Sequence, residues 1–279
     1  MQNNKGLIVL SLFDGMSCGQ IALERAGIAV DNYYASEIDK HCITVTQANY
    51  PNTIQLGDIL NVNANDLPKI DLLIGGSPCQ GFSFAGKQLN FDDPRSKLFF
   101  EYVRLLKECN PTYFMLENVR MKRESQDIIS ECLGVEPIMI NSNLVSAQNR
   151  HRLYWTNIDK IEQPIDKCIL LKDILNDHAF CIQPHNNSFK QTATQSYTES
   201  KHKCLLANAG DKTQGIGIHN KKLYWRKLTP IECERLQNVP DDYTLPVIIG
   251  RIKSPRQRYK MLCNGWTVDV IAHIFSYIK

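Results

Sequence analysis

The chain has 279 residues, of which 43% are hydrophobic and 22% are charged. This composition is that of a globular protein and excludes wholesale disorder, and the length suits one large α/β domain or one domain with a smaller partner. No run of 18 apolar residues is present, so we expect no membrane span. Residues 1–5 lack the apolar segment of a signal peptide, so we expect a cytoplasmic protein.

The net charge of +3 is distributed unevenly. Residues 201–260 carry thirteen Lys or Arg and five Asp or Glu, which leaves a slight acidic excess elsewhere. A local basic excess is typical of a surface that binds a polyanion, although a solvated Lys-rich face gives the same count. The ten cysteines contain no Cys-x-x-Cys pair, which argues against a zinc ribbon, and we expect no metal and mostly buried thiols in a reducing compartment.

Short apolar runs alternate with helical patterns over residues 1–158. The expected strands are 7–12, 32–36, 53–56, 71–74 and 113–116, the expected helices are 17–26, 39–49 and 96–109, and 137–145 with 152–158 are expected to form a closing strand pair. This alternation predicts an α/β fold with a doubly wound, mostly parallel, Rossmann-like sheet. Ligands of such sheets bind beyond the carboxyl ends of the strands.

Residues 159–225 have a different texture, rich in Asn, Gln, Lys, His and Ser and weak in periodicity. We expect a small irregular subdomain there rather than more sheet. Thr229 and Pro230 then favour a helix start, with Thr as N-cap and Pro in the first turn, and residues 268–278 predict an amphipathic helix. Residues 226–279 are therefore expected to complete the domain that residues 1–158 begin.

Three strand ends predict a nucleoside pocket. The turn at 13–19 follows the first strand, and its glycines permit close approach of a ligand to the backbone, but it is not the G-x-G-x-x-G pattern. Glu37 after the second strand could accept hydrogen bonds from ribose hydroxyls, and Asp58 after the third could accept one from an exocyclic amine. Each is also typical of a helix cap or turn, but together they favour an adenosine site.

The strongest signal is Gly-Gly-Ser-Pro-Cys-Gln-Gly-Phe-Ser at residues 75–83. It puts Cys79 in a loop at the functional edge of the sheet, and Pro78 fixes the backbone just before it. An accessible thiolate there can act as a nucleophile, although only a few per cent is ionised near neutral pH at an ordinary pKa of about 8.5. An inert thiol, as at the other nine cysteines, is the alternative.

Two more motifs carry charged groups. Glu117 ends the fifth strand at the same edge as Cys79, and a carboxyl group whose pKa is raised by burial could protonate a ring nitrogen. Arg150 and Arg152 are two residues apart in an extended segment, which places both on one side, where they could hold a carboxylate, a phosphate or a carbonyl oxygen. The alternative for Glu117 is a cap of the following helix, and the alternative for the two arginines is surface charge at a strand edge.

The order of these motifs resembles the cytosine-5 DNA methyltransferase family. The resemblance covers most of the chain except 159–225, where that family has its variable target-recognition region. It rests on Phe-Asp-Gly-Met-Ser-Cys-Gly, Pro-Cys-Gln, Glu-Asn-Val, Gln-x-Arg-x-Arg, the stretch 226–237 and Asn-Gly-Trp-Thr-Val. In detail these are most similar to the animal de novo methyltransferase catalytic domain, whereas the compact size suggests a bacterial or phage member. The first turn and the final Asn-Gly-Trp depart from the usual bacterial pattern.

The resemblance implies methyl transfer from S-adenosyl-L-methionine to C5 of a cytosine flipped out of double-stranded DNA. Cys79 would add to C6, Glu117 would hold N3, Arg150 would orient Glu117, and Arg152 would bind the ring O2 or a nearby phosphate. The implied cofactor residues are Phe13, Asp14, Gly15, Cys18, Gly19, Glu37, Ile38, Asp58, Ile59, Pro78, Leu98, Asn264 and Trp266.

Three alternatives stay open at this point. A transfer RNA cytosine-5 methyltransferase of the same fold would carry a Cys-Phe-Thr tripeptide, which does not occur here. An inactive DNA-binding homologue would usually have lost Cys79 or Glu117. A cysteine hydrolase would need a histidine placed to activate Cys79, and no motif provides one. Besides DNA, a companion restriction endonuclease is a candidate partner.

Overall fold

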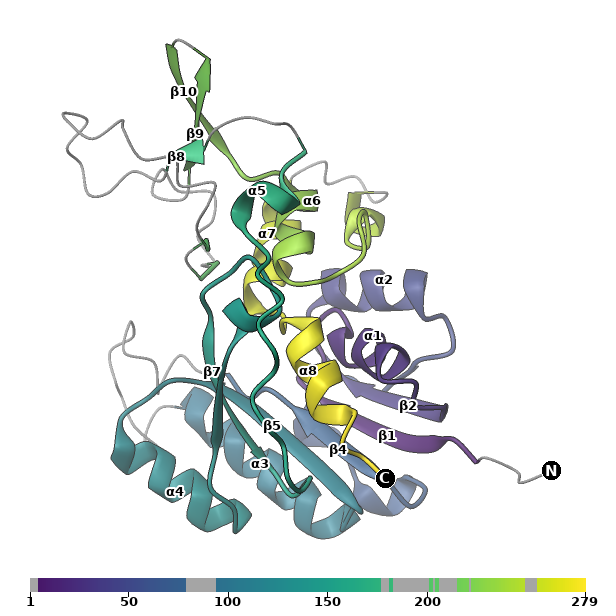
Figure 1. Cartoon of the computed structure of the whole chain (residues 1–279). Helices are drawn as coiled ribbons and strands as arrows, with labels where there is room; N and C mark the ends of the chain where they lie inside the picture. The colour runs from purple at the N-terminus through teal and green to yellow at the C-terminus, as the bar shows by residue number, and fades with distance from the viewer. Residues whose placement is uncertain are drawn as a thin grey trace. The chain divides into compact units, whose positions relative to one another are not determined.

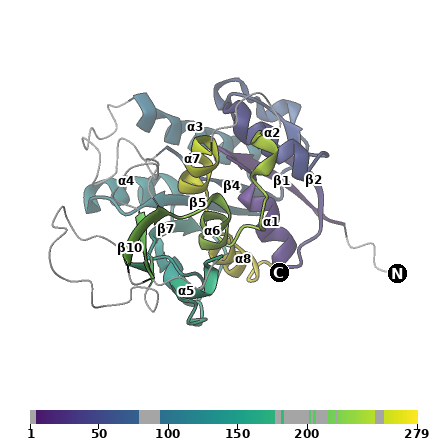
Figure 2. The ribbon, with the colours of Figure 1, turned by 90° about the horizontal axis from the view of Figure 1, so that it is seen from above.

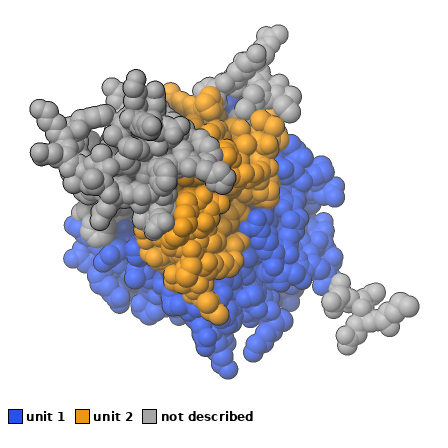
Figure 3. Space-filling model, turned by 45° about the horizontal axis from the view of Figure 1, so that its top comes forward, with its two compact units in different colours: residues 1–140, 151–163, 271–279 blue, residues 141–150, 164–270 orange. Residues whose placement is uncertain are grey.

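The computed structural model describes residues 5–78, 94–176, 181–182, 201–202, 204–205, 215–220, 222–248 and 255–279. Of these, 94–97, 181–182, 215–227 and 247–248 are described by their backbone only. The chain divides into two compact units, which Figure 3 distinguishes by colour. Unit 1 comprises residues 1–140, 151–163 and 271–279, and unit 2 comprises residues 141–150 and 164–270.

A seven-stranded sheet has the strand order β3-β2-β1-β4-β5-β7-β6. Its strands are β1 (Leu7–Leu12), β2 (Val30–Ser36), β3 (Ile54–Gln55), β4 (Leu72–Gly75), β5 (Tyr113–Val119), β6 (Ile138–Asn141) and β7 (His151–Thr156). The pairs β2–β3, β1–β2, β1–β4 and β4–β5 are parallel, and β5–β7 is antiparallel. The chain thus runs outward from β1 in two directions, which creates a switch point between β1 and β4.

Helices cover both faces of this sheet. They are α1 (Cys18–Arg25), α2 (Lys40–Asn49), α3 (Pro94–Cys109) and α4 (Arg123–Leu133), with short 3-10 turns at Ile59–Asn61 and Ala64–Asp66. In Figure 1, α1 and α2 lie on one side of the strands and α3 and α4 on the other. Figure 2 gives the view from above, with α1 and α2 beside β1 and β2.

The core of unit 1 forms between the sheet and its helices. Leu10, Leu73, Tyr102 and Trp155 are fully buried members of one hydrophobic cluster, in which every second strand residue points toward the helices. Gly75 is the last residue of β4, and a Cβ there would meet the carbonyl oxygen of Leu12 and the ring of Tyr102 at 3.0 Å, so a side chain would fit only with a shift of these neighbours.

Unit 2 contains a three-stranded sheet of order β10-β9-β8 and several helices. Its strands are β8 (Cys181–Ile182), β9 (Gly215–Asn220) and β10 (Lys222–Lys227). Its helices are α5 (Leu171–Ile174), α6 (Pro230–Leu236) and α7 (Arg256–Asn264), with a 3-10 turn at Leu245–Ile248. The helix α8 (Val268–Phe275) contributes residues to both units. β9 pairs antiparallel with both β8 and β10.

The structure confirms the α/β fold class and the expected elements of residues 1–158, including the closing pair β6 and β7. Thr229 caps α6 as expected, in a capping box with Glu232. The expectation of no sheet within 159–225 is wrong, because β9 and β10 form a hairpin there. The compact units also divide the chain differently from the predicted functional domains, which remain a prediction.

Candidate active site

The sheet register brings four strand ends of unit 1 into one row. Leu12 of β1 pairs with Ser36 of β2 and with Gly75 of β4, and Gly75 pairs with Leu116 of β5. The residue that follows each of these positions therefore lies at the same edge of the sheet. These residues are Phe13, Glu37, Gly76 and Glu117.

Glu37 is fixed at this edge by main-chain donors. Gly15 N donates to its Oε2 at 2.8 Å, and Ile38 N and Asp39 N both donate to its Oε1 at 2.8 Å. The left-handed φ of Gly15, 61°, turns that N–H toward the carboxylate. Three bonds hold the carboxylate in one orientation while it stays half-buried, so it retains acceptor capacity for a ligand.

Asp14 organises the turn after β1 through its side chain. Its carboxylate accepts hydrogen bonds from Ser11 Oγ at 2.6 Å, Tyr33 Oη at 2.7 Å and Ser17 Oγ. Burial raises the pKa of Asp14 to about 6, the three hydroxyl donors act in the opposite direction, and the charge of Glu37 raises the pKa further. These bonds lock a turn in which Ser17 has a left-handed φ of 58°.

Other predicted cofactor residues of unit 1 differ in accessibility. Ile38 is 71% exposed beside Glu37, and Asp58 is half-buried with its Oδ1 accepting from Leu60 N at 3.1 Å. The side chains of Cys18 and Ile59 are buried, so any ligand contact from them would come from the main chain. The residues Phe13, Gly15 and Pro78 are partly exposed, Gly19 is buried, and Leu98 packs against the core.

Glu117 forms an ion pair with Arg152, which lies on the neighbouring antiparallel strand. Arg152 Nε is 2.9 Å from Glu117 Oε1, and 14% and 11% of the two side chains are exposed. The next residue, Asn118, donates from Nδ2 to Ser77 Oγ at 3.0 Å. This bond ties the end of β5 to the segment that leads into Pro78, a role for Asn118 that its place in the Glu-Asn-Val motif did not reveal.

Arg150 does not make the contact with Glu117 that the family resemblance implied. The ion pair with Glu117 belongs to Arg152, whereas the guanidinium of Arg150 donates to the carbonyl oxygens of Cys263 and Gly265. The two arginines have different partners because Arg150 precedes β7. The alternation that predicted both side chains on one side applies only within a regular strand.

Three predicted site residues lie outside the described part of unit 1. Cys79 is not among the described residues, so its role stays a prediction. Asn264 is exposed and Trp266 half-buried, and both belong to unit 2.

Within the described ranges, no group of three His, Cys, Asp or Glu could hold a metal ion. No helix in the same ranges is long and apolar enough to cross a membrane.

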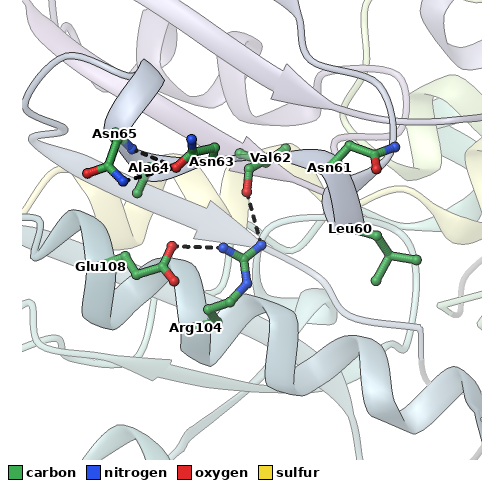
Figure 4. A pocket seen from close by; sticks show the side chains of 8 residues that line it. All are labelled: Leu60, Asn61, Val62, Asn63, Ala64, Asn65, Arg104 and Glu108. Carbon is green, nitrogen blue, oxygen red and sulfur yellow. Dashed lines mark hydrogen bonds and ion pairs between the residues drawn. The ribbon is translucent and has the colours of Figure 1, made fainter.

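A surface depression of unit 1 begins two residues after Asp58. It is lined by residues 60–65 together with Arg104 and Glu108 (Figure 4). Arg104 is already engaged there by Glu101 and Glu108 and by the carbonyl oxygen of Val62. We therefore assign the depression no part in the chemistry.

Comparison with known proteins identifies the class. The C-5 cytosine-specific DNA methylase family matches residues 7–165 and 160–279, which together span nearly the whole chain. The chain belongs to this family, and it is an enzyme that methylates cytosine C5 in DNA.

Relatives over the full length are bacterial enzymes. The chain is 30% identical to a type II methyltransferase, M.NlaX of Neisseria lactamica, over 97% of this chain and 96% of that one. It is 29% identical to M.Bsp6I of Bacillus sp. strain RFL6, over 98% of both chains. An orphan methyltransferase of Bacillus phage SPR is 37% identical over 54% of this chain and 38% of its own length.

Solved structures share the fold. The Spodoptera frugiperda DNMT2 mutant has a TM-score of 0.74 at 21% identity, over 98% of this chain and 99% of that one. The Entamoeba histolytica methyltransferase EhMeth has a TM-score of 0.75 at 17% identity, over 98% of both chains. At such identities the likeness concerns the fold alone.

Proposed function

We propose that this DNA cytosine-5 methyltransferase takes its methyl group from S-adenosyl-L-methionine, bound at the carboxyl edge of the unit 1 sheet. The observation that carries the proposal is the Glu37 carboxylate, held by the backbone N–H groups of Gly15, Ile38 and Asp39. A carboxylate fixed in this way can accept both vicinal hydroxyls of a ribose.

The neighbouring residues fit the rest of an adenosine. Ile38 offers an exposed apolar side chain next to Glu37, and Asp58 offers a half-buried carboxylate to an exocyclic amine. Phe13 follows β1 at the same edge and would pack against the base. The turn locked by Asp14 keeps the N-terminus of α1 close to this site, where a ligand carboxylate is favoured.

For the chemistry, we assign Cys79 as nucleophile and Glu117 as the acid that acts on N3. The Cys79 thiolate forms a bond to C6 of the flipped cytosine, while Glu117 holds N3 and stabilises the charge that develops on the ring. When bound, the cofactor supplies the methyl group that C5 receives. A base then removes the C5 proton, the bond between sulfur and C6 breaks, and the Cys79 thiolate is released.

Arg152, rather than Arg150, orients Glu117 in this scheme, since the two side chains form an ion pair at 2.9 Å. The ion pair fixes the direction of the Glu117 carboxyl group, which is almost fully buried.

The proposed substrate is double-stranded DNA, with the basic stretch 201–260 facing its phosphates. The type II relatives favour a companion restriction endonuclease as a further partner, and the cytoplasm as the place of action. DNA binding through phosphates predicts that affinity falls steeply with salt.

A direct test incubates the purified protein with mixed-sequence duplex DNA and methyl-labelled cofactor and then maps 5-methylcytosine. We expect label at C5 within one short recurring sequence. Transfer RNA is incubated in parallel, and transfer to RNA without transfer to DNA would contradict the proposal.

The nucleophile is tested with Cys79→Ala, for which we expect a loss of roughly 10⁴-fold or more in rate. Cys109→Ala is the matched control, because burial raises the pKa of the Cys109 thiol and keeps it protonated. Full activity of Cys79→Ala would refute the assigned mechanism. Unchanged cofactor binding by Cys79→Ala would show that the variant is folded.

A further inference from the structure

The Gln-x-Arg part of the Gln-x-Arg-x-Arg motif is buried within unit 2. Gln148 has no exposed surface and Arg150 is 3% exposed. A buried guanidinium is costly unless its donors are satisfied, so the partners of Arg150 define what it does.

Arg150 joins two chain segments that are far apart in sequence. Its Nη2 donates to the carbonyl oxygens of Cys263 at 3.1 Å and Gly265 at 2.9 Å, and its Nη1 donates to Cys204 Sγ at 3.4 Å. Two of these three acceptors are main-chain carbonyl oxygens, which carry no charge. The planar fork of the guanidinium fixes all three directions at once.

His202 and Leu205 are held along the motif by main-chain and side-chain bonds. His202 N donates to Ala147 O at 2.6 Å, and Asn149 N donates to His202 O at 2.7 Å. Leu205 N donates to Gln148 Oε1 at 2.8 Å. A segment of the predicted recognition region is therefore attached directly to residues 147–149, which precede Arg150.

The segment after α7 is held by a matching set of buried bonds. Thr267 Oγ1 donates to Gln237 Oε1 at 2.8 Å, and Ser142 Oγ donates to Thr267 Oγ1 at 3.0 Å. Gln237 Nε2 donates to Leu262 O at 2.6 Å. We call Ser142, Gln148, Arg150, Gln237 and Thr267 the buried polar network.

We propose that Arg150 is a positioning residue that couples the recognition segment 201–205 to the cofactor segment 263–266, so that DNA and cofactor strengthen each other's binding. The inference rests on the proposed function and on two expectations from the family resemblance, that Asn264 and Trp266 bind the cofactor and that 159–225 recognises DNA. A ligand that orders one segment orders the other through the guanidinium, and the effect is equal in both directions.

The test measures coupling rather than activity. The affinity of the product S-adenosylhomocysteine is determined by calorimetry with and without a duplex that contains the methylation site. In the wild type we expect the duplex to tighten cofactor binding about tenfold, within the 5- to 150-fold range of ordinary coupling.

Two variants separate coupling from general damage. Arg150→Lys keeps the charge but cannot reach both carbonyl oxygens and the thiol. Cys204→Ala removes the sulfur that accepts from Arg150 on the recognition side, together with its bond to Leu205 O. In both variants we expect the tenfold tightening of cofactor binding by the duplex to be lost almost completely. Arg258→Lys is the control for lost stability, since the partners described for Arg258 are Glu234, Thr244 and Asp242, outside both segments.

The outcomes are distinct. A wild type in which duplex and cofactor bind independently overturns the inference, and so does a wild-type coupling factor in both Arg150→Lys and Cys204→Ala. A loss of coupling in Arg258→Lys equal to that in Arg150→Lys also overturns it. A wild type that does not bind the cofactor product at all overturns the proposed cofactor itself.

Discussion

Two regions of the molecule use polar side chains in opposite ways. One is the strand-end site of unit 1, formed by Asp14, Glu37, Asp58 and Glu117, and the other is the buried polar network of unit 2. Glu37 and Asp58 stay half-buried and accept bonds from adjacent backbone, which leaves room for a ligand. Gln148 and Gln237 have no exposed surface and bind other parts of the chain. Membership of a family motif therefore does not imply contact with substrate.

The largest expected effect that tests this contrast is on Glu117. Glu117→Gln removes the group that can exchange a proton with N3 but keeps an acceptor oxygen for Arg152, so the rate of methyl transfer should fall roughly 10²- to 10⁴-fold while the protein stays folded. Single-turnover kinetics together with thermal unfolding measure the two effects. Glu124→Gln, on α4, is the control. A loss of stability in proportion to the loss of rate would place Glu117 with the structural residues.

Within unit 2 the largest effect should be on stability. Arg258 is 5% exposed and donates to Glu234, which has no exposed surface, at 2.9 Å. Arg258→Met leaves the charge of that carboxylate without its buried cation and should lower the free energy of unfolding by about 3–5 kcal/mol in denaturant titration. Adding Glu234→Gln should recover part of the loss, because the stranded charge is then gone. Without that recovery, the loss would lie in packing rather than charge.

A smaller effect is expected from pH at Asp14. Its folded pKa of about 6 lies above the unfolded value of 3.8, so its contribution to stability is full below pH 4 and is lost as pH rises to 6. The loss is at most about 3 kcal/mol. Asp14→Asn should therefore gain stability relative to the wild type across this interval. Parallel unfolding curves of the two proteins from pH 4 to 7 would refute the raised pKa.

The smallest effect concerns a local cap in unit 2. Thr229 Oγ1 accepts from Glu232 N at 3.2 Å, and Glu232 Oε2 accepts from Thr229 N at 2.7 Å. Thr229→Ala should cost about 1 kcal/mol of stability, and Thr229→Ser should cost much less. Equal losses in the two variants would mean that the methyl group, not the hydroxyl, is what matters. Either variant should leave the buried polar network intact.

Sequence reasoning succeeded where short-range patterns determine the structure. The apolar runs before Phe13 and Glu37 placed both residues directly after their strands, as the structure has them, whereas β5 continues two residues past Glu117. The register aligns all three positions across the sheet. Sequence reasoning failed for Arg150, whose partners are 113 and 115 residues away, because a period of two describes only the local backbone. The hairpin of β9 and β10 was missed because His-Asn-Lys-Lys carries no Asn-Gly or Asp-Gly turn signal.

Unit 1 is assembled from three separate stretches of chain, 1–140, 151–163 and 271–279. On the ribosome, where synthesis proceeds from the N-terminus, the first stretch emerges long before the third. Tyr113 at the start of β5 donates to Lys279 O, and Tyr277 accepts a bond from Glu162 N, so unit 1 gains contacts only after all of unit 2 has been made. Until then its sheet must persist without these contacts, and nascent chains arrested before residue 271 should be more sensitive to protease than the released protein.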